Sequence, residues 1–214
     1  MHHKNYEAAL NECEGKAVLL CVSKYHSVEE AMKLYDAGVR DFGENHAQEL
    51  LKKSGAMPKD IRWHFIGHLQ KDKVKKVVPI ASLIESLDSL ELAAKIEAVA
   101  GRCGKVMPCL IEVHLAEEDT EKTGASEAEL LPLAEACLAL PHLQIRGIMV
   151  MGPHTEDESK IRAVFEKGHR LFSMLKARYG EAISVYSAGM SGDYRIALTC
   201  GSTEVRLGSC LFEK

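Results

Sequence analysis

No apolar run in this 214-residue sequence approaches the roughly 18 consecutive residues that a membrane-spanning helix requires. The longest such stretches, residues 17–22 and 145–151, are less than half that length. The opening residues, Met1-His2-His3-Lys4, lead into a polar segment and not into the apolar core of an export signal. The sequence therefore predicts a cytoplasmic protein without a membrane span.

An excess of positive charge is also missing. The 27 lysines and arginines are outnumbered by 31 aspartates and glutamates, the formal net charge is −4, and no basic run is long enough to attract a nucleic acid duplex. Apolar residues make up 46% of the chain and charged residues 27%, which is typical of soluble globular proteins and not of disordered ones. We therefore expect no nucleic acid partner.

Several enzyme signatures are absent as well. The seven cysteines form no Cys-x-x-Cys pair, which is typical of reduced thiols in a cytosolic protein. His64 and His68 are four residues apart, but they fall where a strand passes into a loop, and no His-Glu-x-x-His or clustered Cys/His spacing occurs, so we expect no metal site. A Gly-x-Ser-x-Gly nucleophile motif is missing too, and no Gly-x-Gly-x-x-Gly follows the first apolar run.

What the chain does contain is an alternation of short apolar runs with amphipathic stretches. There are eight runs, at residues 17–23, 39–43, 61–67, 83–87, 107–114, 145–151, 183–188 and 204–209. Strands that are mostly apolar and separated by helices indicate a parallel sheet covered by helices. Eight such units predict one α/β domain over residues 1–214, a (β/α)8 barrel of the TIM type, and an open doubly wound sheet is the alternative.

Helix boundaries can be predicted from capping patterns. Ser27-Val28-Glu29-Glu30 forms a capping box at the start of a helix that leads to Gly38. Ser126 fits a second helix start, although Pro132 predicts that this helix begins late or kinks. Because so few residues follow the last run, we expect no helix after it, and a helix over about residues 5–13 would fill the vacant place in the outer ring.

Active sites of parallel barrels lie at the carboxyl ends of the strands. The polar residues expected there are Lys24, Asn45, His68, Asp88, His114, Ser187 and Ser209. Lys24 shares a strand face with Val22, and a partly desolvated lysine in the mouth of a barrel is suited to attack an aldehyde and form a Schiff base. A lysine that has left the strand and points into water is the alternative.

The last run places Glu204, Arg206 and Gly208 on one strand face and two apolar residues on the other. If Arg206 projects into the barrel, it needs a partner, which is either Glu204 in an internal ion pair or an atom of a ligand. The segments Gly201-Ser202-Thr203 and Gly208-Ser209 allow backbone amides and hydroxyls to approach an anion, although such segments also form ordinary turns.

Five motifs occur in a characteristic order along the chain. They are Val22-Ser23-Lys24, Asp41-Phe42-Gly43-Glu44-Asn45, the segment from Trp63 to Gln70, Gly189-Met190-Ser191-Gly192-Asp193, and the segment from Gly201 to Gly208. With these motifs the chain, from about Ala17 to Phe212, resembles the pyridoxal phosphate homeostasis protein family, which is related to the barrel domain of alanine racemase.

The resemblance implies a barrel that binds pyridoxal 5′-phosphate (PLP). Lys24 resembles the Schiff-base lysine and Arg206 the residue that faces the pyridine nitrogen, with Asn45 beside the cofactor. The remaining expected cofactor-binding residues are Ser187, Gly208 and Ser209, which fall where the racemase barrel holds the phosphate, together with Met190 and Ser202. Three positions depart from the family pattern and put finer contacts in doubt, namely Asp72, His114 and Ala188. No catalytic residue is expected.

Three functions are compatible with these residues. The resemblance favours a non-catalytic carrier that holds PLP as a Schiff base on Lys24 and helps to regulate its free level, as a monomer that serves apo forms of PLP-dependent enzymes. An amino-acid racemase of the alanine racemase type is the alternative, and it requires acid/base groups on both faces of the substrate. The third candidate is a barrel enzyme that acts on a phosphorylated metabolite and uses Lys24 as a base or Schiff-base former without a cofactor.

Overall fold

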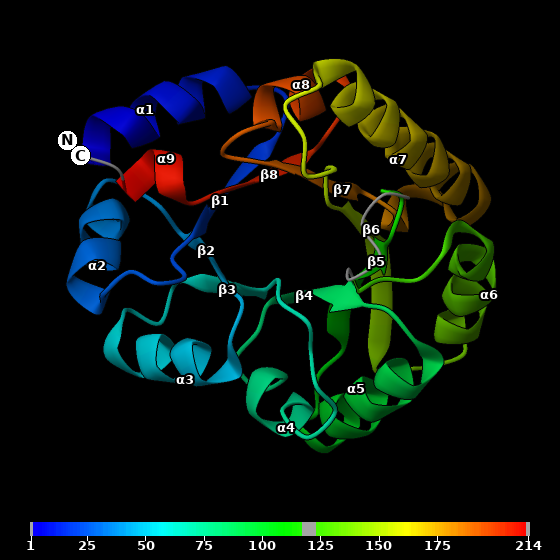
Figure 1. Cartoon of the computed structure of the whole chain (residues 1–214). Helices are drawn as coiled ribbons and strands as arrows, with labels where there is room; N and C mark the ends of the chain where they lie inside the picture. Colours follow the sequence, from blue (N-terminus) through cyan, green and yellow to red (C-terminus); the bar gives the residue numbers. More distant parts are fainter. Residues whose placement is uncertain (1, 117–122, 213–214) are drawn as a thin grey trace.

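A computed structural model describes residues 2–116 and 123–212 of the chain, and its centre is a closed barrel of eight parallel strands (Figure 1). The strands are β1 Val18–Val22, β2 Asp41–Glu44, β3 Arg62–Phe65, β4 Leu83–Leu87, β5 Met107–Val113, β6 Leu143–Val150, β7 Val185–Met190 and β8 Glu204–Leu207. Each strand pairs with the next along the chain, and β8 closes the barrel on β1 through the pair Val18 and Glu204. The (β/α)8 barrel is thereby confirmed, and the open sheet is excluded.

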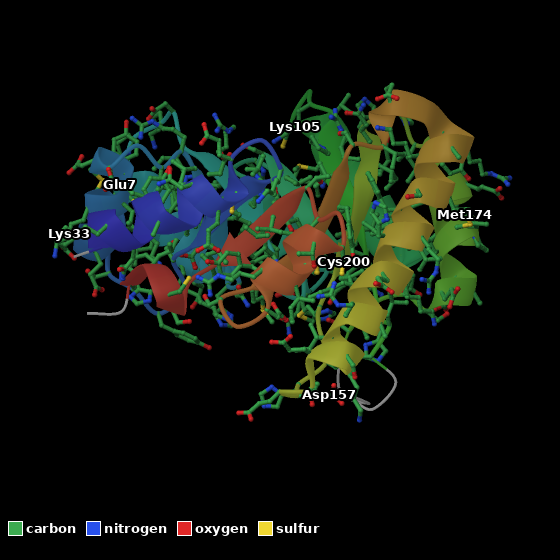
Figure 2. All side chains as sticks on the ribbon, turned by 90° about the horizontal axis from the view of Figure 1, so that it is seen from above. Glu7, Lys33, Lys105, Asp157, Met174 and Cys200 are labelled. Carbon is green, nitrogen blue, oxygen red and sulfur yellow. The ribbon has the colours of Figure 1, made fainter. Side chains whose placement is uncertain are left out.

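Helices form a ring around the barrel (Figure 1). They are α1 His2–Cys13, α2 Val28–Asp36, α3 Ala47–Ala56, α4 Val74–Val77, α5 Leu90–Arg102, α6 Glu127–Leu138, α7 Glu158–Tyr179, α8 Tyr194–Thr199 and α9 Ser209–Phe212, with a 3₁₀ turn at Gly180–Ala182. The capping box at Ser27 is confirmed, since Glu30 and Ser27 exchange backbone-to-side-chain hydrogen bonds. Figure 2 shows α7 with Asp157 at its N-terminal end and Met174 on its outer side.

Two predictions about helices need correction. Helix α6 is not delayed by Pro132: it begins directly after Ser126, whose backbone N–H and hydroxyl both donate to the Glu129 carboxylate. A helix, α9, also follows the last strand, and its Leu211 and Phe212 are buried. This short helix is stabilised by packing and not by the intrinsic helix preference of four residues.

The N-terminal helix α1 takes the predicted place in the outer ring. It packs against α2 and α9, and its Glu12 carboxylate accepts hydrogen bonds from Tyr194 and Arg195 of α8. Within the described ranges, no helix combines the length and the apolar character that crossing a membrane demands.

The strand alternation predicted for β8 is confirmed. Val205 and Leu207 face outward into the large apolar core between strands and helices, whereas Arg206 lines a cavity in the barrel mouth. A smaller apolar cluster of Leu83, Leu110 and Met149 fills part of the barrel interior. Charged side chains are buried there too, so the interior combines an apolar wall with a polar network beneath the mouth.

Candidate functional site

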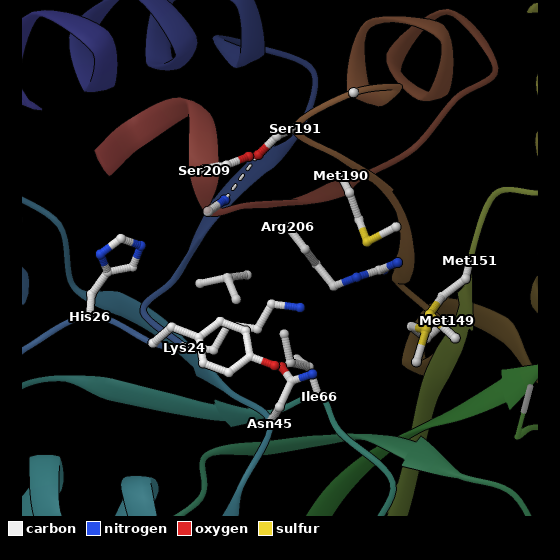
Figure 3. Close-up of a pocket in the computed structure, with 14 residues that line it drawn as sticks. Lys24, His26, Asn45, Ile66, Met149, Met151, Met190, Ser191, Arg206 and Ser209 are labelled. Atoms are coloured by element: carbon white, nitrogen blue, oxygen red, sulfur yellow. Dashed lines mark hydrogen bonds between the residues drawn. The ribbon is translucent and has the colours of Figure 1, made fainter. Parts of the chain in front are cut away.

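A cavity of about 370 Å³ opens at the carboxyl end of the strands (Figure 3). Its volume lies in the range of about 300–1,000 Å³ that small-molecule sites occupy. The wall is formed by Val22, Lys24, Tyr25, His26, Asn45, Ile66, Met149, Met151, Met190, Ser191, Gly192, Arg206, Gly208 and Ser209. Six of the eight residues expected from the sequence are among them, and they lie at the ends of four different strands, β1, β2, β7 and β8.

Lys24 follows β1 and extends its amine into the cavity (Figure 3). Within the described part of the chain, its Nζ has neither a hydrogen-bond partner nor an ion-pair partner. The next residue, Tyr25, has a backbone φ of +67° and is the one described non-glycine residue in the left-handed region. Such a conformation costs about 1–3 kcal/mol and is found where the surrounding structure imposes it, often at functional sites.

A buried ion pair between Lys53 and Glu44 stabilises the turn that contains Lys24 and Tyr25. Lys53 of α3 donates from Nζ to the Ser23 carbonyl oxygen and to Glu44 Oε1, at 2.6 Å in both cases. The Ser23 hydroxyl donates to the same carboxylate oxygen at 2.6 Å. The side chains of Lys53 and Glu44 are 1% and 0% exposed, so neither has water as a substitute partner. Through Ser23, the pair fixes the peptide that leads into Lys24.

Arg206 enters the cavity from β8, and its own partners lie inside the barrel. Nη1 donates to Ser187 Oγ at 2.6 Å, and Nη2 donates to the Val150 carbonyl oxygen at 2.9 Å. The internal ion pair with Glu204 that the sequence left open is not formed. The guanidinium is therefore anchored by neutral groups and still faces the cavity across from the Lys24 amine (Figure 3).

Hydroxyls and backbone groups gather at one end of the cavity. Ser191, Gly192, Gly208 and Ser209 converge there from the loops after β7 and β8. The Ser191 hydroxyl accepts a hydrogen bond from the Gly208 N–H at 3.2 Å, which joins the two loops (Figure 3). Hydroxyls and backbone amides gathered at a loop of this kind bind phosphate groups.

Ser187 and Ser202 do not line the cavity, in contrast to their expected place among the cofactor contacts. Ser187 is fully buried one layer below the mouth, where its hydroxyl donates to Glu85 Oε2 at 2.6 Å. The hydroxyl of Ser202 is buried against the carbonyl oxygens of Ala188 and Glu204, at 2.8 Å from each. Ser187 is engaged with Arg206 and Ser202 with the backbone of the barrel, whereas Ser191 lines the cavity.

The three departures from the family pattern also lie outside the cavity. Asp72 is exposed and paired with Lys73, Ala188 is buried in the core, and His114 follows β5 without reaching the cavity wall. His68 and Asp88, two other polar residues at strand ends, lie 3.5 Å apart outside the wall. None of these positions therefore contributes to the cavity wall.

Sequence reasoning missed several wall residues. Met149 of β6 and Met151, which directly follows that strand, both line the cavity. His26 lies on the opposite side and stacks on Phe212 of α9, with ring centroids 3.7 Å apart. The alternation of side chains along β6 could have indicated that the methionines face the barrel interior. The stacking of His26 on Phe212 joins residues far apart in the sequence, and no local pattern predicts it.

Residues 2–213 match the family described as alanine racemase, N-terminal domain. The pyridoxal phosphate homeostasis protein of Aquifex aeolicus is 38% identical over 200 residues, which cover 93% of this chain and 87% of the relative. The chain belongs to the pyridoxal phosphate homeostasis protein family. Relatives with the same name from Pasteurella multocida and Schizosaccharomyces pombe are each 36% identical over more than nine-tenths of the chain.

Solved structures agree with this membership. PipY of Synechococcus elongatus PCC7942, solved without PLP, superposes with a TM-score of 0.94 at 30% identity and covers 99% of this chain and 100% of its own. The same protein with PLP bound gives a TM-score of 0.87. Alanine racemase of Clostridium difficile shares the barrel at a TM-score of 0.78, with 16% identity and 55% of its chain covered. For the racemases, the likeness therefore concerns the fold alone.

Proposed function

We propose that this protein binds PLP in the cavity, holds it through Lys24, and acts in the cytoplasm as a reversible carrier that balances the supply of PLP to other proteins. The names of its relatives and the PLP-bound PipY structure support this proposal. The observation that carries it is the amine of Lys24, which has no hydrogen-bond or ion-pair partner among the described residues and faces Arg206 across a cavity with hydroxyls and backbone amides at one end. The residues present thus fit an aldehyde, a ring nitrogen and a phosphate.

Bound PLP supplies an aldehyde that reacts with amines. The neutral amine of Lys24 adds to the aldehyde carbon, a C=N bond forms, and the carbonyl oxygen leaves as water, so the step needs no further reactant. Ser191, Ser209 and the backbone of Gly208 bind the phosphate in this proposal. Because water or a competing amine reverses the bond, retention is firm but not permanent.

Arg206 makes this site suited to storage. A guanidinium does not give up its proton under ordinary conditions, so it donates to the pyridine nitrogen and leaves that nitrogen unprotonated. An unprotonated ring withdraws electrons poorly, which disfavours carbanion chemistry on bound amino acids. The rim is also open: Tyr25 is 85% exposed and Met190 39% exposed, so water and amines can enter.

Donation is tested by mixing the PLP-loaded protein with an apo-enzyme that requires PLP, in the presence of a scavenger of free PLP. We expect the apo-enzyme to gain activity while the visible absorbance band of the carrier declines. The Lys24→Ala variant at the same PLP concentration is the control, and it should activate the apo-enzyme only when the scavenger is absent. If the apo-enzyme gains no activity while the carrier keeps its band, direct donation is wrong and storage remains. A wild-type protein that gains no band refutes PLP binding itself.

The racemase alternative predicts a different result with alanine. Two-sided proton transfer needs acid/base groups on both faces of the substrate, but Lys24, Tyr25 and His26 all come from one strand end, and Met149 and Met151 lie across the cavity (Figure 3). A missing general base slows proton transfer by about 10²–10⁴-fold. We therefore expect negligible exchange of the alanine α-hydrogen in deuterated water, measured by NMR. Fast exchange with inversion would favour the racemase.

A further inference from the structure

A chain of hydrogen bonds leads from Arg206 down into the barrel, below the cavity. Arg206 Nη1 donates to Ser187 Oγ at 2.6 Å, and Ser187 Oγ donates to Glu85 Oε2 at 2.6 Å. The other oxygen of Glu85 lies 2.9 Å from His64 Nδ1. Four strands, β8, β7, β4 and β3, each contribute one member, so the chain crosses the barrel interior.

The donors fix the direction of the first two bonds in this chain. A guanidinium only donates, so the oxygen of Ser187 accepts from Arg206, and the single hydroxyl hydrogen of Ser187 must point to Glu85. Glu85 can accept it only with an unprotonated oxygen. Burial alone would raise the pKa of Glu85, but His64 and Arg206 outweigh burial and hold that pKa below its usual range. Glu85 therefore carries a negative charge, opposite to the positive charge of Arg206.

Neighbouring groups keep the charge on Glu85. Burial lowers the pKa of His64, but Glu204 and Glu85 outweigh burial and raise it to about 9, so the ring is cationic at neutral pH. Burial and the charge of Glu85 raise the pKa of Glu204 above its usual range. Glu204 Oε1 has no hydrogen-bond partner among the described residues. One polar side-chain atom of each of His64, Glu85 and Glu204 lies within 4.8 Å of the other two.

We propose that Glu85 is the positioning residue of Arg206: acting through Ser187, it fixes the guanidinium in the orientation that faces the cavity. Without this anchor, Arg206 would keep one contact, to the Val150 carbonyl oxygen, and could turn toward Glu204, which lies two residues away on the same strand face. The anchor consists of hydrogen bonds between side chains of the protein itself. Its consequence for PLP binding rests on the proposed function.

The orientation of Arg206 can be measured without PLP. In the ¹⁵N NMR spectrum of the full-length cofactor-free protein, an anchored guanidinium gives separate Nη1 and Nη2 signals, and a rotating one gives a single averaged signal. We expect separate signals for Arg206 in the wild type, assigned by their loss in Arg206→Lys. Rotation should accelerate at least about tenfold in Glu85→Gln and in Ser187→Ala, as loss of a charge-assisted hydrogen bond implies. The Ser187→Ala variant removes only an oxygen and serves if Glu85→Gln does not fold.

Glu112→Gln is the matched control. Glu112 is buried in the same barrel and accepts from Thr123 Oγ1 at 3.1 Å, outside the chain to Arg206. Its replacement should leave the rotation of Arg206 unchanged. Unchanged rotation in both Glu85→Gln and Ser187→Ala would overturn the proposal. So would a stoichiometric metal ion bound to His64, Glu85 and Glu204 in the purified protein, because Glu85 would then serve the metal.

A double-mutant cycle separates positioning from general structural damage. We expect Glu85→Gln to raise the dissociation constant of PLP about tenfold in the wild-type background and less than about twofold in an Arg206→Gln background, since coupled residues are not additive. An equal increase in both backgrounds would contradict positioning through Arg206. If the wild type binds no PLP, the proposed function fails, while the rotation of Arg206 still decides the role of Glu85.

Discussion

Replacing Lys24 by alanine should abolish both the visible band of the PLP-loaded protein and the adduct trapped by borohydride. Lys24 is proposed as the one side chain that bonds covalently to the aldehyde, so no reducible C=N bond can form without it. Binding through Arg206 and through the hydroxyls and backbone amides at one end of the cavity should persist, but weakly and reversibly. The measurement is the absorbance spectrum before and after borohydride, followed by peptide mapping of the reduced protein.

The fold of the Lys24→Ala variant should be unchanged. The Lys24 amine has no hydrogen-bond or ion-pair partner in the described ranges, and substitutions at such positions change stability by about 0.5 kcal/mol or less. Lys73→Ala is the matched control, because Lys73 lines a neighbouring cleft together with Asn45. That variant should keep the band and the adduct. An adduct mapped to Lys73, or to any other lysine, would contradict the assignment of Lys24.

The positions of Lys24 and Arg206 could be predicted because both depend on local pattern. A lysine directly after an apolar run lies at a strand end, and alternation along β8 separates Arg206 from Val205 and Leu207. Both rules need only neighbouring residues, and the structure agrees with both. The depth of a residue inside a barrel, in contrast, depends on the stagger between strands.

Ser187 illustrates this dependence on stagger. It pairs with Glu204, and the register between β7 and β8 shifts before Met190 pairs with Arg206. The irregularity includes Gly189, whose φ of +96° suits glycine. Counting alternate residues along β7 cannot detect this shift. As a result Ser187 lies one layer below the mouth, while Met190 and Ser191 reach the cavity.

The buried charges were also beyond sequence reasoning. Glu85 lies in the middle of an otherwise mostly apolar run, and its partners His64 and Ser187 are 21 and 102 residues away. Lys53 occupies a helix whose other lysine, Lys52, is exposed, so nothing local separates a buried lysine from a solvated one. Pairing between distant strands and helices determines these roles, and one sequence does not reveal it.

The buried pair of Lys53 and Glu44 should have the largest effect on stability. Lys53→Met keeps most of the side-chain volume but leaves the Glu44 carboxylate buried without a cation, and Glu44 Oε2 already has no hydrogen-bond partner. Breaking a buried ion pair by removing one partner costs about 3–5 kcal/mol. We expect a loss of this size in the free energy of unfolding, measured by urea denaturation of the cofactor-free protein.

Two further variants test whether the loss of stability comes from the unpaired charge of Glu44. Lys52→Met changes the neighbouring exposed lysine of α3 and should cost no more than about 0.5 kcal/mol. The double variant Lys53→Met/Glu44→Gln removes both charges and should recover part of the loss, because replacing both partners is far less costly than removing one. A loss for Lys53→Met no greater than that for Lys52→Met would contradict the role of the pair. Lys53 also donates to the Ser23 carbonyl oxygen, and the double variant lacks this hydrogen bond. We therefore expect the double variant to regain part of its stability without regaining full PLP affinity. This result would separate the effect of Lys53 on the Lys24 turn from its effect on the stability of the fold.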